Sequence, residues 1–294
     1  MRRAILGLCI LVVGALIPAA AAGEGRALTC AGQQVTIAGT PNDDLLYGTS
    51  GPDVIVAQGG NDVIFAKGGA DIVCAGDGID YVYGGVGSDT IYGGPGADII
   101  YAGKGDLDRV FGGAGDDFID AGSGNNKDIF GNDGRDRIRL RYNATGLYSV
   151  KGGPGKDTID LRKSTVRADV RLDWVSPYYC FGPAPCIWPS GWLFSIENVL
   201  GTAFSDVIYG NDYKNLIKGS HGDDVIHGMG GNDRIFGNGG DDSLHGRTGD
   251  DWLDGGTGAF DTADGGADSN AGGIDQDDCY LVEFPSNCSI IFAP

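Results

Sequence analysis

The chain has 294 residues, with 40 acidic and 21 basic side chains, which give a formal net charge of -19 at pH 7. This acidity excludes proteins that bind nucleic acid through a basic surface. Only three of the acidic residues are glutamates, and 54 residues are glycines. Unpatterned, such a composition would indicate disorder, so the arrangement of the aspartates and glycines decides the fold class.

Residues 1–22 have the features of a secretory signal peptide. Two arginines precede an apolar run over residues 4–17, and three alanines at 20–22 supply the small residues typical of a cleavage site. The run is shorter than the roughly 20 residues of a membrane-spanning helix. We therefore expect a secreted, extracellular protein with no membrane span, whose mature chain begins near Gly23. A lipid anchor at Cys9 is the alternative, although Cys9 lies inside the apolar run.

A nine-residue repeat begins at Gly39, after a short segment of residues 23–38. The first units read GTPNDDLLY, GTSGPDVIV, AQGGNDVIF and AKGGADIVC. Two blocks, 39–160 and 201–264, share this repeat, with two ten-residue units in the first block and one in the second. A fixed period of this kind predicts a solenoid built from stacked units.

Three positions of the nine-residue unit hold the same type of residue in most units. Position four is glycine in most units, as expected where a turn needs a positive φ. Position eight is a branched apolar residue, which gives each unit one core side chain and predicts a thin core. Position six is aspartate in nearly all units. The candidate metal ligands are therefore Asp44, Asp53, Asp62, Asp71, Asp80, Asp89, Asp98, Asp108, Asp117, Asp136, Asp157, Asp206, Asp224, Asp233, Asp242 and Asp251.

The spacing of these aspartates indicates calcium. If each unit is a turn and a short strand, two units form one coil, and residues eighteen apart stack about 4.8 Å from each other. Columns of stacked carboxylates repel one another. Calcium resolves the repulsion because it takes 6–8 oxygen ligands, which carboxylates and turn carbonyls can supply. Zinc and copper favour His and Cys, which the frame lacks, and magnesium demands a stricter octahedron. Multiple Ca²⁺ ions are the predicted cofactors. Aspartates that only shape turns, without an ion, are the alternative.

The units GGVGSDTIY (84–92) and GGPGADIIY (93–101) resemble the GGxGxDxUx repeat of the RTX, or haemolysin-type, calcium-binding family. The resemblance extends from residue 39 to about 264 and implies an all-β parallel β-roll, in which turn residues one to six of each unit bind calcium between coils. Some units depart from the pattern, and their sites are expected to be weak or empty. At position six these are Asn215 and Lys127, and at the turn glycine they are Asn42, Phe204 and Tyr213.

Six cysteines lie beyond the expected signal peptide: Cys30, Cys74, Cys180, Cys186, Cys279 and Cys288. An even number in an exported chain suggests disulfides, and fifteen pairings are conceivable. Disulfides between Cys180 and Cys186 and between Cys279 and Cys288 would each close a short loop. The stretch LTCAGQQVTIAGT and the unit ending DIVC resemble a secreted, actinobacterial-type subset of the family, in which Cys30 would pair with Cys74. That bond requires the N-terminal segment to fold back, and free thiols are the alternative.

The other segments are a disulfide-bonded N-terminal cap (23–38), an insertion (161–200) and a C-terminal cap (265–294). The insertion is rich in aromatic residues and proline and holds three of the four tryptophans. It either covers a flank of the roll or forms a platform for a cell-surface glycan or protein ligand. Tyr47, Phe65, Tyr83 and Tyr101 should form one aromatic ladder, and His227 should lie beside His245, where a transition-metal site is an alternative to incidental proximity.

The resulting functional hypothesis is a secreted, non-catalytic protein whose calcium ions are required for folding. The first alternative is an adhesion or glycan-binding module that acts through residues 161–200. A hydrolase is less favoured because the chain has no HExxH or GxSxG motif. An acid pair involving Asp169 or Asp173 is conceivable, but nothing in the sequence selects it.

Overall fold

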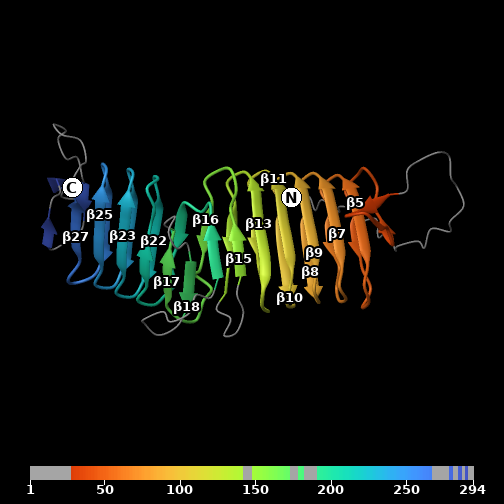
Figure 1. Cartoon of the computed structure of the whole chain (residues 1–294), viewed down its shortest axis with the longest axis horizontal. Coiled ribbons are helices and arrows are strands. Elements are labelled where there is room, and N and C mark those ends of the chain that lie inside the picture. The colour runs from red at the N-terminus through yellow and green to blue at the C-terminus, as the bar shows by residue number, and fades with distance from the viewer. Residues whose placement is uncertain are drawn as a thin grey trace, which may run out of the picture.

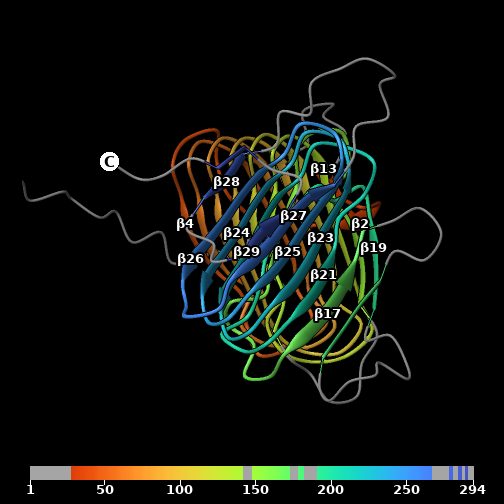
Figure 2. The same ribbon diagram turned by 90° about the vertical axis from the view of Figure 1, so that its left-hand side faces the viewer.

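The computed structural model describes residues 28–141, 148–172, 178–181, 191–266, 278–280, 284–286 and 289–290. These residues form two long, almost entirely parallel β-sheets and a small two-stranded sheet, without a helix. In Figure 1 the strands stand side by side along the long axis, from β5 (Val54–Gly59) near one end to β27 (Thr262–Gly266) near the other. Viewed toward the β27 end, successive coils superimpose (Figure 2). The predicted all-β parallel β-roll is confirmed.

One sheet has 13 strands. In order along the sheet they are β4 (Leu45–Tyr47), β6 (Val63–Phe65), β8 (Tyr81–Val86), β10 (Ile99–Lys104), β12 (Phe118–Asp120), β14 (Arg137–Arg139), β16 (Thr158–Asp160), β20 (Asn198–Leu200), β22 (Leu216–His221), β24 (Arg234–Gly239), β26 (Trp252–Thr257), β28 (Asp278–Tyr280) and β30 (Ser289–Ile290).

The other sheet has 15 strands. In order they are β3 (Ile37–Ala38), β5, β7 (Ile72–Asp77), β9 (Thr90–Pro95), β11 (Arg109–Ala114), β13 (Lys127–Asp133), β15 (Tyr148–Lys151), β19 (Gly191–Phe194), β18 (Tyr178–Phe181), β17 (Ala168–Arg171), β21 (Val207–Tyr209), β23 (Val225–Gly230), β25 (Ser243–Thr248), β27 and β29 (Phe284–Ser286). Only β18 runs antiparallel to its neighbours in this sheet.

The nine-residue period sets the register of both sheets. Successive units alternate between the two sheets, so that Ile64 pairs with Val82, eighteen residues later, and Val82 with Ile100. These position-eight side chains point between the sheets and are fully buried. Because each strand contributes so little apolar surface, the core is a single narrow stack, as the sequence predicted.

The two repeat blocks form one continuous roll, a point that the sequence left open. In the 13-stranded sheet, β20 pairs in parallel with both β16 and β22, and so joins the first block directly to the second. In the 15-stranded sheet, β17, β18 and β19 lie between β15 and β21. The insertion therefore contributes strands to both sheets.

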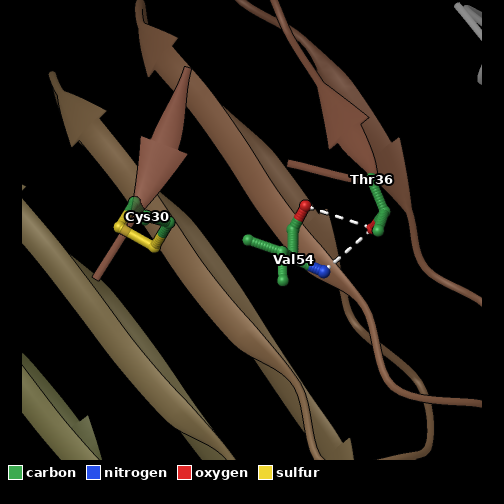
Figure 3. The surroundings of a disulfide bond; sticks show 4 residues. Cys30, Thr36 and Val54 are labelled. Carbon is green, nitrogen blue, oxygen red and sulfur yellow. Dashed lines mark hydrogen bonds between the residues drawn. A yellow bond between two sulfur atoms is a disulfide. The ribbon is translucent and has the colours of Figure 1, made fainter. Parts of the chain in front are cut away.

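The N-terminal cap folds back onto the roll. Its strands β1 (Thr29–Cys30) and β2 (Gln33–Gln34) form an antiparallel pair, and Cys30 forms a disulfide with Cys74 of β7, at a Cα–Cα distance of 5.9 Å (Figure 3). The Thr36 hydroxyl donates to the Val54 carbonyl oxygen and accepts from the Val54 N–H. The pairing of Cys30 with Cys74 is confirmed.

The remaining cysteine predictions are not tested in the same way. Cys279 is buried and disulfide-bonded. The structure does not describe Cys186, Cys288 or the side chain of Cys180. The expected signal peptide also lies outside the described residues. Within the described part of the chain, no helix has the length and apolarity needed to cross a membrane.

Aromatic ladders run along the outside of the roll. Tyr47, Phe65, Tyr83 and Tyr101 stack with ring centroids 4.7–5.3 Å apart, which confirms the predicted ladder. The 15-stranded sheet carries a second ladder that the sequence analysis missed, formed by Tyr92, Phe111 and Phe130. Both ladders follow from the parallel register, which places the last residue of one unit directly beside the last residue of the unit stacked on it.

Candidate metal columns

The position-six side chains form two columns, one beside each sheet, at the point where each turn enters its strand. The first column, beside the 13-stranded sheet, contains Asp44, Asp62, Asp80, Asp98, Asp117, Asp136, Asp157, Glu197, Asn215, Asp233 and Asp251. The second column contains Asp53, Asp71, Asp89, Asp108 and Lys127, and resumes with Asp206, Asp224, Asp242 and Asp261. All sixteen predicted ligands belong to these columns and are buried.

Each carboxylate uses one oxygen to link neighbouring coils. The Asp80 N–H donates to Asp98 Oδ1 at 2.9 Å, and the Asp98 N–H donates to Asp117 Oδ1 at 2.8 Å. The same bond recurs along both columns. It fixes each carboxylate in one orientation, so the second oxygen, Oδ2, points in a defined direction.

The second oxygen is the unusual feature of the site. In eleven of these aspartates Oδ2 is buried and has no hydrogen-bond partner: Asp62, Asp71, Asp80, Asp89, Asp98, Asp117, Asp136, Asp157, Asp224, Asp233 and Asp242. A buried charged oxygen without a partner costs several kcal/mol. Proteins rarely leave such atoms unpaired, so a repeated set of them indicates a missing cation.

In eight of these eleven units the glycine at position one lies close to both the orphaned oxygen and a carbonyl oxygen of the next coil. A methyl group placed on Gly93 would collide with both Asp98 Oδ2 and the carbonyl oxygen of Gly112, which belongs to the next coil of the same sheet. A methyl group on Gly131 would likewise collide with Asp136 Oδ2 and the Gly152 carbonyl oxygen. Carboxylate and carbonyl oxygens thus converge from successive coils, and this is a donor set that suits calcium.

Buried aspartates outside the columns are treated differently. Asp160 is paired with Arg137 at 2.5 Å and with Arg139 at 3.2 Å, and Asp120 is paired with Arg141 at 2.6 Å. At Asp120 and Asp160 the chain therefore supplies a guanidinium to the buried carboxylate. It supplies none to the eleven orphaned oxygens.

Burial also makes these carboxyls weak acids in the metal-free chain. It raises the pKa of Asp98 to about 7 and that of Asp117 to about 8, and neighbouring column aspartates raise both further, while backbone hydrogen bonds offset part of the effect. In the second block, burial raises the pKa of Asp224 and Asp233 to about 8. Without a cation, much of the column favours the protonated form near neutral pH.

Not every aspartate in the columns has an orphaned oxygen. Asp44 Oδ2 accepts hydrogen bonds from the Thr40 N–H and hydroxyl, at 2.5 and 3.0 Å. Asp53 Oδ2 is bonded in the same way by Thr49. At Asp206 the Thr202 N–H donates to Oδ2 and the Thr202 hydroxyl donates to Oδ1. These three residues lie in the units that begin with Gly-Thr, at the start of each repeat block. Their threonines supply hydrogen bonds that the orphaned oxygens of the other column aspartates lack.

Asn215 and Glu197 are the other departures in the first column. Asn215 Oδ1 accepts from the Asn211 N–H, and its Nδ2 donates to the Glu197 carbonyl oxygen at 2.7 Å. The uncharged amide of Asn215 therefore makes the hydrogen bonds of this turn in place of a carboxylate. The Glu197 side chain takes a column position, where Oε2 accepts from the Asp157 N–H at 2.8 Å.

Among the described residues, no three His, Cys, Asp or Glu side chains converge on one point. Each coil contributes one carboxylate to a column, so most ligands of an ion would be backbone oxygens. This is the arrangement expected for a hard cation held between turns rather than for a transition metal.

The RTX calcium-binding nonapeptide repeat family matches the chain over residues 38–73, 75–106, 108–127, 200–235 and 227–259. These segments cover about half of the chain and contain most of the column residues. The chain belongs to the RTX family. No curated protein matches it significantly. The RTX repeats imply a calcium-binding β-roll protein.

Two acidic residues of the RTX columns were absent from the predicted ligand set. Asp261 belongs to a ten-residue unit at the end of the second block, and its Oδ1 accepts from the Asp242 N–H at 2.8 Å. A frame that allows a tenth residue, as at Asp108, would have found it. Glu197 lies 40 residues after Asp157 in sequence, outside any nine-residue frame, and no sequence signal assigns it.

The histidines do not form a metal site in the described part of the structure. His227 and His245 are in register on adjacent strands, as predicted, and their rings stack with centroids 4.5 Å apart. Stacked rings direct their nitrogens in parallel rather than toward one point. Burial lowers the pKa of His227 to about 4, so this pair extends an aromatic ladder that begins at Tyr209.

The raised pKa values predict an unusual pH dependence. Because the pKa of these carboxyls lies near 3.8 in the unfolded chain and at about 6 to 8 in the fold, the folded state binds more protons between these limits. Raising the pH from 5 to 8 should therefore destabilise the metal-free protein. Calcium competes with protons for the same oxygens, so its stabilising effect should grow over this range.

Thermal unfolding at pH 5, 6, 7 and 8, with metal-free and calcium-saturated protein side by side, measures this effect. The melting temperature of the metal-free protein should fall with pH, and the gap between the two samples should widen. A metal-free melting temperature that rises from pH 5 to 8 would contradict the assignment of protonated, buried column carboxyls.

Proposed function

We propose that this protein is an extracellular, non-catalytic calcium-binding protein whose ions bind between the coils of the roll and are required for it to fold. The observation that carries the proposal is the row of eleven buried Oδ2 atoms without hydrogen-bond partners. Each is held by an inter-coil hydrogen bond, and turn carbonyls of the next coil lie beside the orphaned oxygens of Asp98 and Asp136.

Calcium would supply charge neutralisation and cross-linking at these positions. One ion at Asp98, for example, would be held by Asp98 Oδ2 and by the Gly112 carbonyl of the next coil, together with other oxygens of the turns. Because the unfolded chain has no such arrangement, the free energy of binding would stabilise the fold directly. The thin core explains why the roll would depend on that contribution.

Secretion is supported by three observations of different kinds. Residues 1–22 have the features of a signal peptide, RTX proteins are typically secreted, and the Cys30–Cys74 disulfide is of the type formed in oxidising compartments. Millimolar calcium outside the cell would fold the chain there, whereas low calcium inside would leave it unfolded. A non-catalytic role is supported by the column geometry, which commits most buried carboxylates to the repeat.

A platform on residues 161–200 for a cell-surface glycan or protein ligand stays a prediction. Trp192 and Phe194 of β19 are exposed, at 42% and 46% of their full accessibility. Most of the other aromatic residues of this segment lie outside the described residues or have side chains that are not described.

Calorimetric titration of calcium into metal-free protein, with magnesium as the control ion, tests the proposal. We expect binding of several calcium ions accompanied by a cooperative gain of β-sheet signal, and little response to magnesium. No calcium binding, or equal binding of both ions, would refute it.

A pair of variants tests which carboxylates matter. Asp98→Asn removes a charged oxygen that has no hydrogen-bond partner, whereas Asp44→Asn makes the same chemical change where Thr40 already satisfies that oxygen. We expect Asp98→Asn to lower the apparent calcium affinity about tenfold, because affinity depends on the number of charged ligands. Asp44→Asn should change it far less. Equal effects of the two substitutions would show that the orphaned oxygens are not the ligands.

A further inference from the structure

Among the described residues, Lys127 is the one cation within the columns. It takes the place of aspartate in the ten-residue unit AGSGNNKDIF, at the position that Asp108 occupies in the ten-residue unit AGKGDLDRVF of the preceding coil. Lysine is among the residues that are least often fully buried, and it is fully buried almost only when its charge is paired. The Lys127 side chain is nevertheless completely inaccessible to solvent.

The Lys127 ammonium is surrounded by oxygens from successive coils. Its Nζ lies 2.7 Å from Asp108 Oδ2, 2.6 Å from the Ala121 carbonyl oxygen and 3.3 Å from the Gly103 carbonyl oxygen. An ammonium has three hydrogen atoms to donate, and three oxygens accept them. The Asp108 carboxylate, equally buried, is neutralised by this contact.

The oxygens around Nζ correspond to those of a calcium position. Ala121 begins the unit stacked on that of Asp108, just as Gly112 begins the unit stacked on that of Asp98. The pair formed by Asp108 Oδ2 and the Ala121 carbonyl is thus equivalent to the pair formed by Asp98 Oδ2 and the Gly112 carbonyl. One pair has an ammonium between its oxygens, and the other has an orphaned oxygen.

Beyond Lys127, the described residues place no carboxylate in the second column until Asp206. The next coil places Tyr148 in register with Lys127, and the buried tyrosine donates its hydroxyl hydrogen to the Gly124 carbonyl at 2.8 Å. Ala168, also buried, precedes Asp206 in the column and donates its N–H to Asp206 Oδ1. Lys127 therefore stands where the first row of aspartates in this column ends.

We propose that Lys127 is a tethered replacement for one calcium ion, which excludes calcium from the position between Asp108 and Ala121 and terminates the calcium row of the second column. The inference rests on the proposed function. Unlike an ion, the ammonium cannot dissociate from the chain, so these two coils stay linked whatever the calcium concentration. The first column has no such cation among its described members, and its row of carboxylates continues through Asp136 and Asp157.

Amine labelling of the wild-type, calcium-saturated protein is the first test. The reagent is an acetylating ester, and modified lysines are identified by mass spectrometry. Lys127 should stay unmodified under conditions in which the exposed Lys104 and Lys156 react to completion. Labelling of Lys127 at the rate of Lys104 would show that calcium displaces the ammonium, and would overturn the inference.

Counting calcium ions by native mass spectrometry is the second test. Lys127→Asp recreates the aspartate found in the unit of Asp108, and should bind one more calcium ion per chain than the wild type. Lys163→Asp is the matched control, because it makes the same charge change at an exposed position outside the repeat units and should bind the wild-type number. An unchanged count in Lys127→Asp, with several ions on the wild type, would refute this inference alone. A wild type that binds no calcium would refute the proposed function as well.

Discussion

Removal of calcium at pH 8 is expected to abolish most of the β-sheet circular dichroism signal of this protein, and restoring calcium should bring it back. The columns hold more acidic groups than the chain neutralises with its own hydrogen-bond donors and cations. Each ion present at a hundred times its dissociation constant would stabilise the fold by about 2.7 kcal/mol. Several such sites together exceed the roughly 5–15 kcal/mol by which folded domains are usually stable.

The experiment compares far-UV spectra of residues 23–294 in excess chelator, in calcium and in magnesium, with the disulfides left intact. Loss of signal in chelator, recovery in calcium and no recovery in magnesium are the expected results. If some signal survives in chelator, hydrogen exchange should place it near the Cys30–Cys74 disulfide and the Lys127 ammonium, which link coils without an ion. An identical spectrum in chelator and in calcium would mean that the aspartates only shape turns.

The period of the sequence was enough to predict the architecture and most of the site. An eighteen-residue coil places Asp62, Asp80 and Asp98 in one column and Tyr47, Phe65 and Tyr83 in one ladder, and both are found. These features depend only on the register of a parallel stack. Any residue inside the frame could be placed in the same way.

Residues outside the frame could not be placed. Glu197 reaches its column only because β20 pairs with β16 across the insertion, which is a long-range pairing that no period encodes. The continuity of the two blocks depends on the same pairing. Ten-residue units shift the frame by one position, and this shift concealed Asp261.

The sequence pattern also did not predict which contacts each column side chain makes. A threonine at position two, such as Thr40 or Thr202, donates a hydrogen bond to the aspartate of its own turn. The nine-residue period alone does not predict that hydrogen bond. At Lys127 the frame predicted a weak or empty site. The frame did not predict the contact itself, an ammonium bound to three oxygens, which forms because a long side chain can fold back into the space between two coils.

Gly78→Ala is expected to destabilise the calcium-loaded roll by about 3 kcal/mol or more. Gly78 is a position-four turn glycine with φ of +129°, and a Cβ atom there would overlap the carbonyl oxygen of Gly60 in the preceding coil. A methyl group would therefore both strain the turn and push two coils apart. That separation would also disturb the inter-coil hydrogen bond from the Asp62 N–H to Asp80 Oδ1.

Gly51→Ala is the matched control, because Gly51 is also a position-four glycine but is not among the residues with positive φ, and the nearest atom to a Cβ there is Thr49 Oγ1 at 3.9 Å. This substitution should leave stability unchanged or raise it by up to about 1 kcal/mol, since alanine restricts the unfolded chain. Denaturant midpoints in saturating calcium measure both effects. Equal midpoints for the two variants would show that the coils are not stacked as closely as the glycines at position four require.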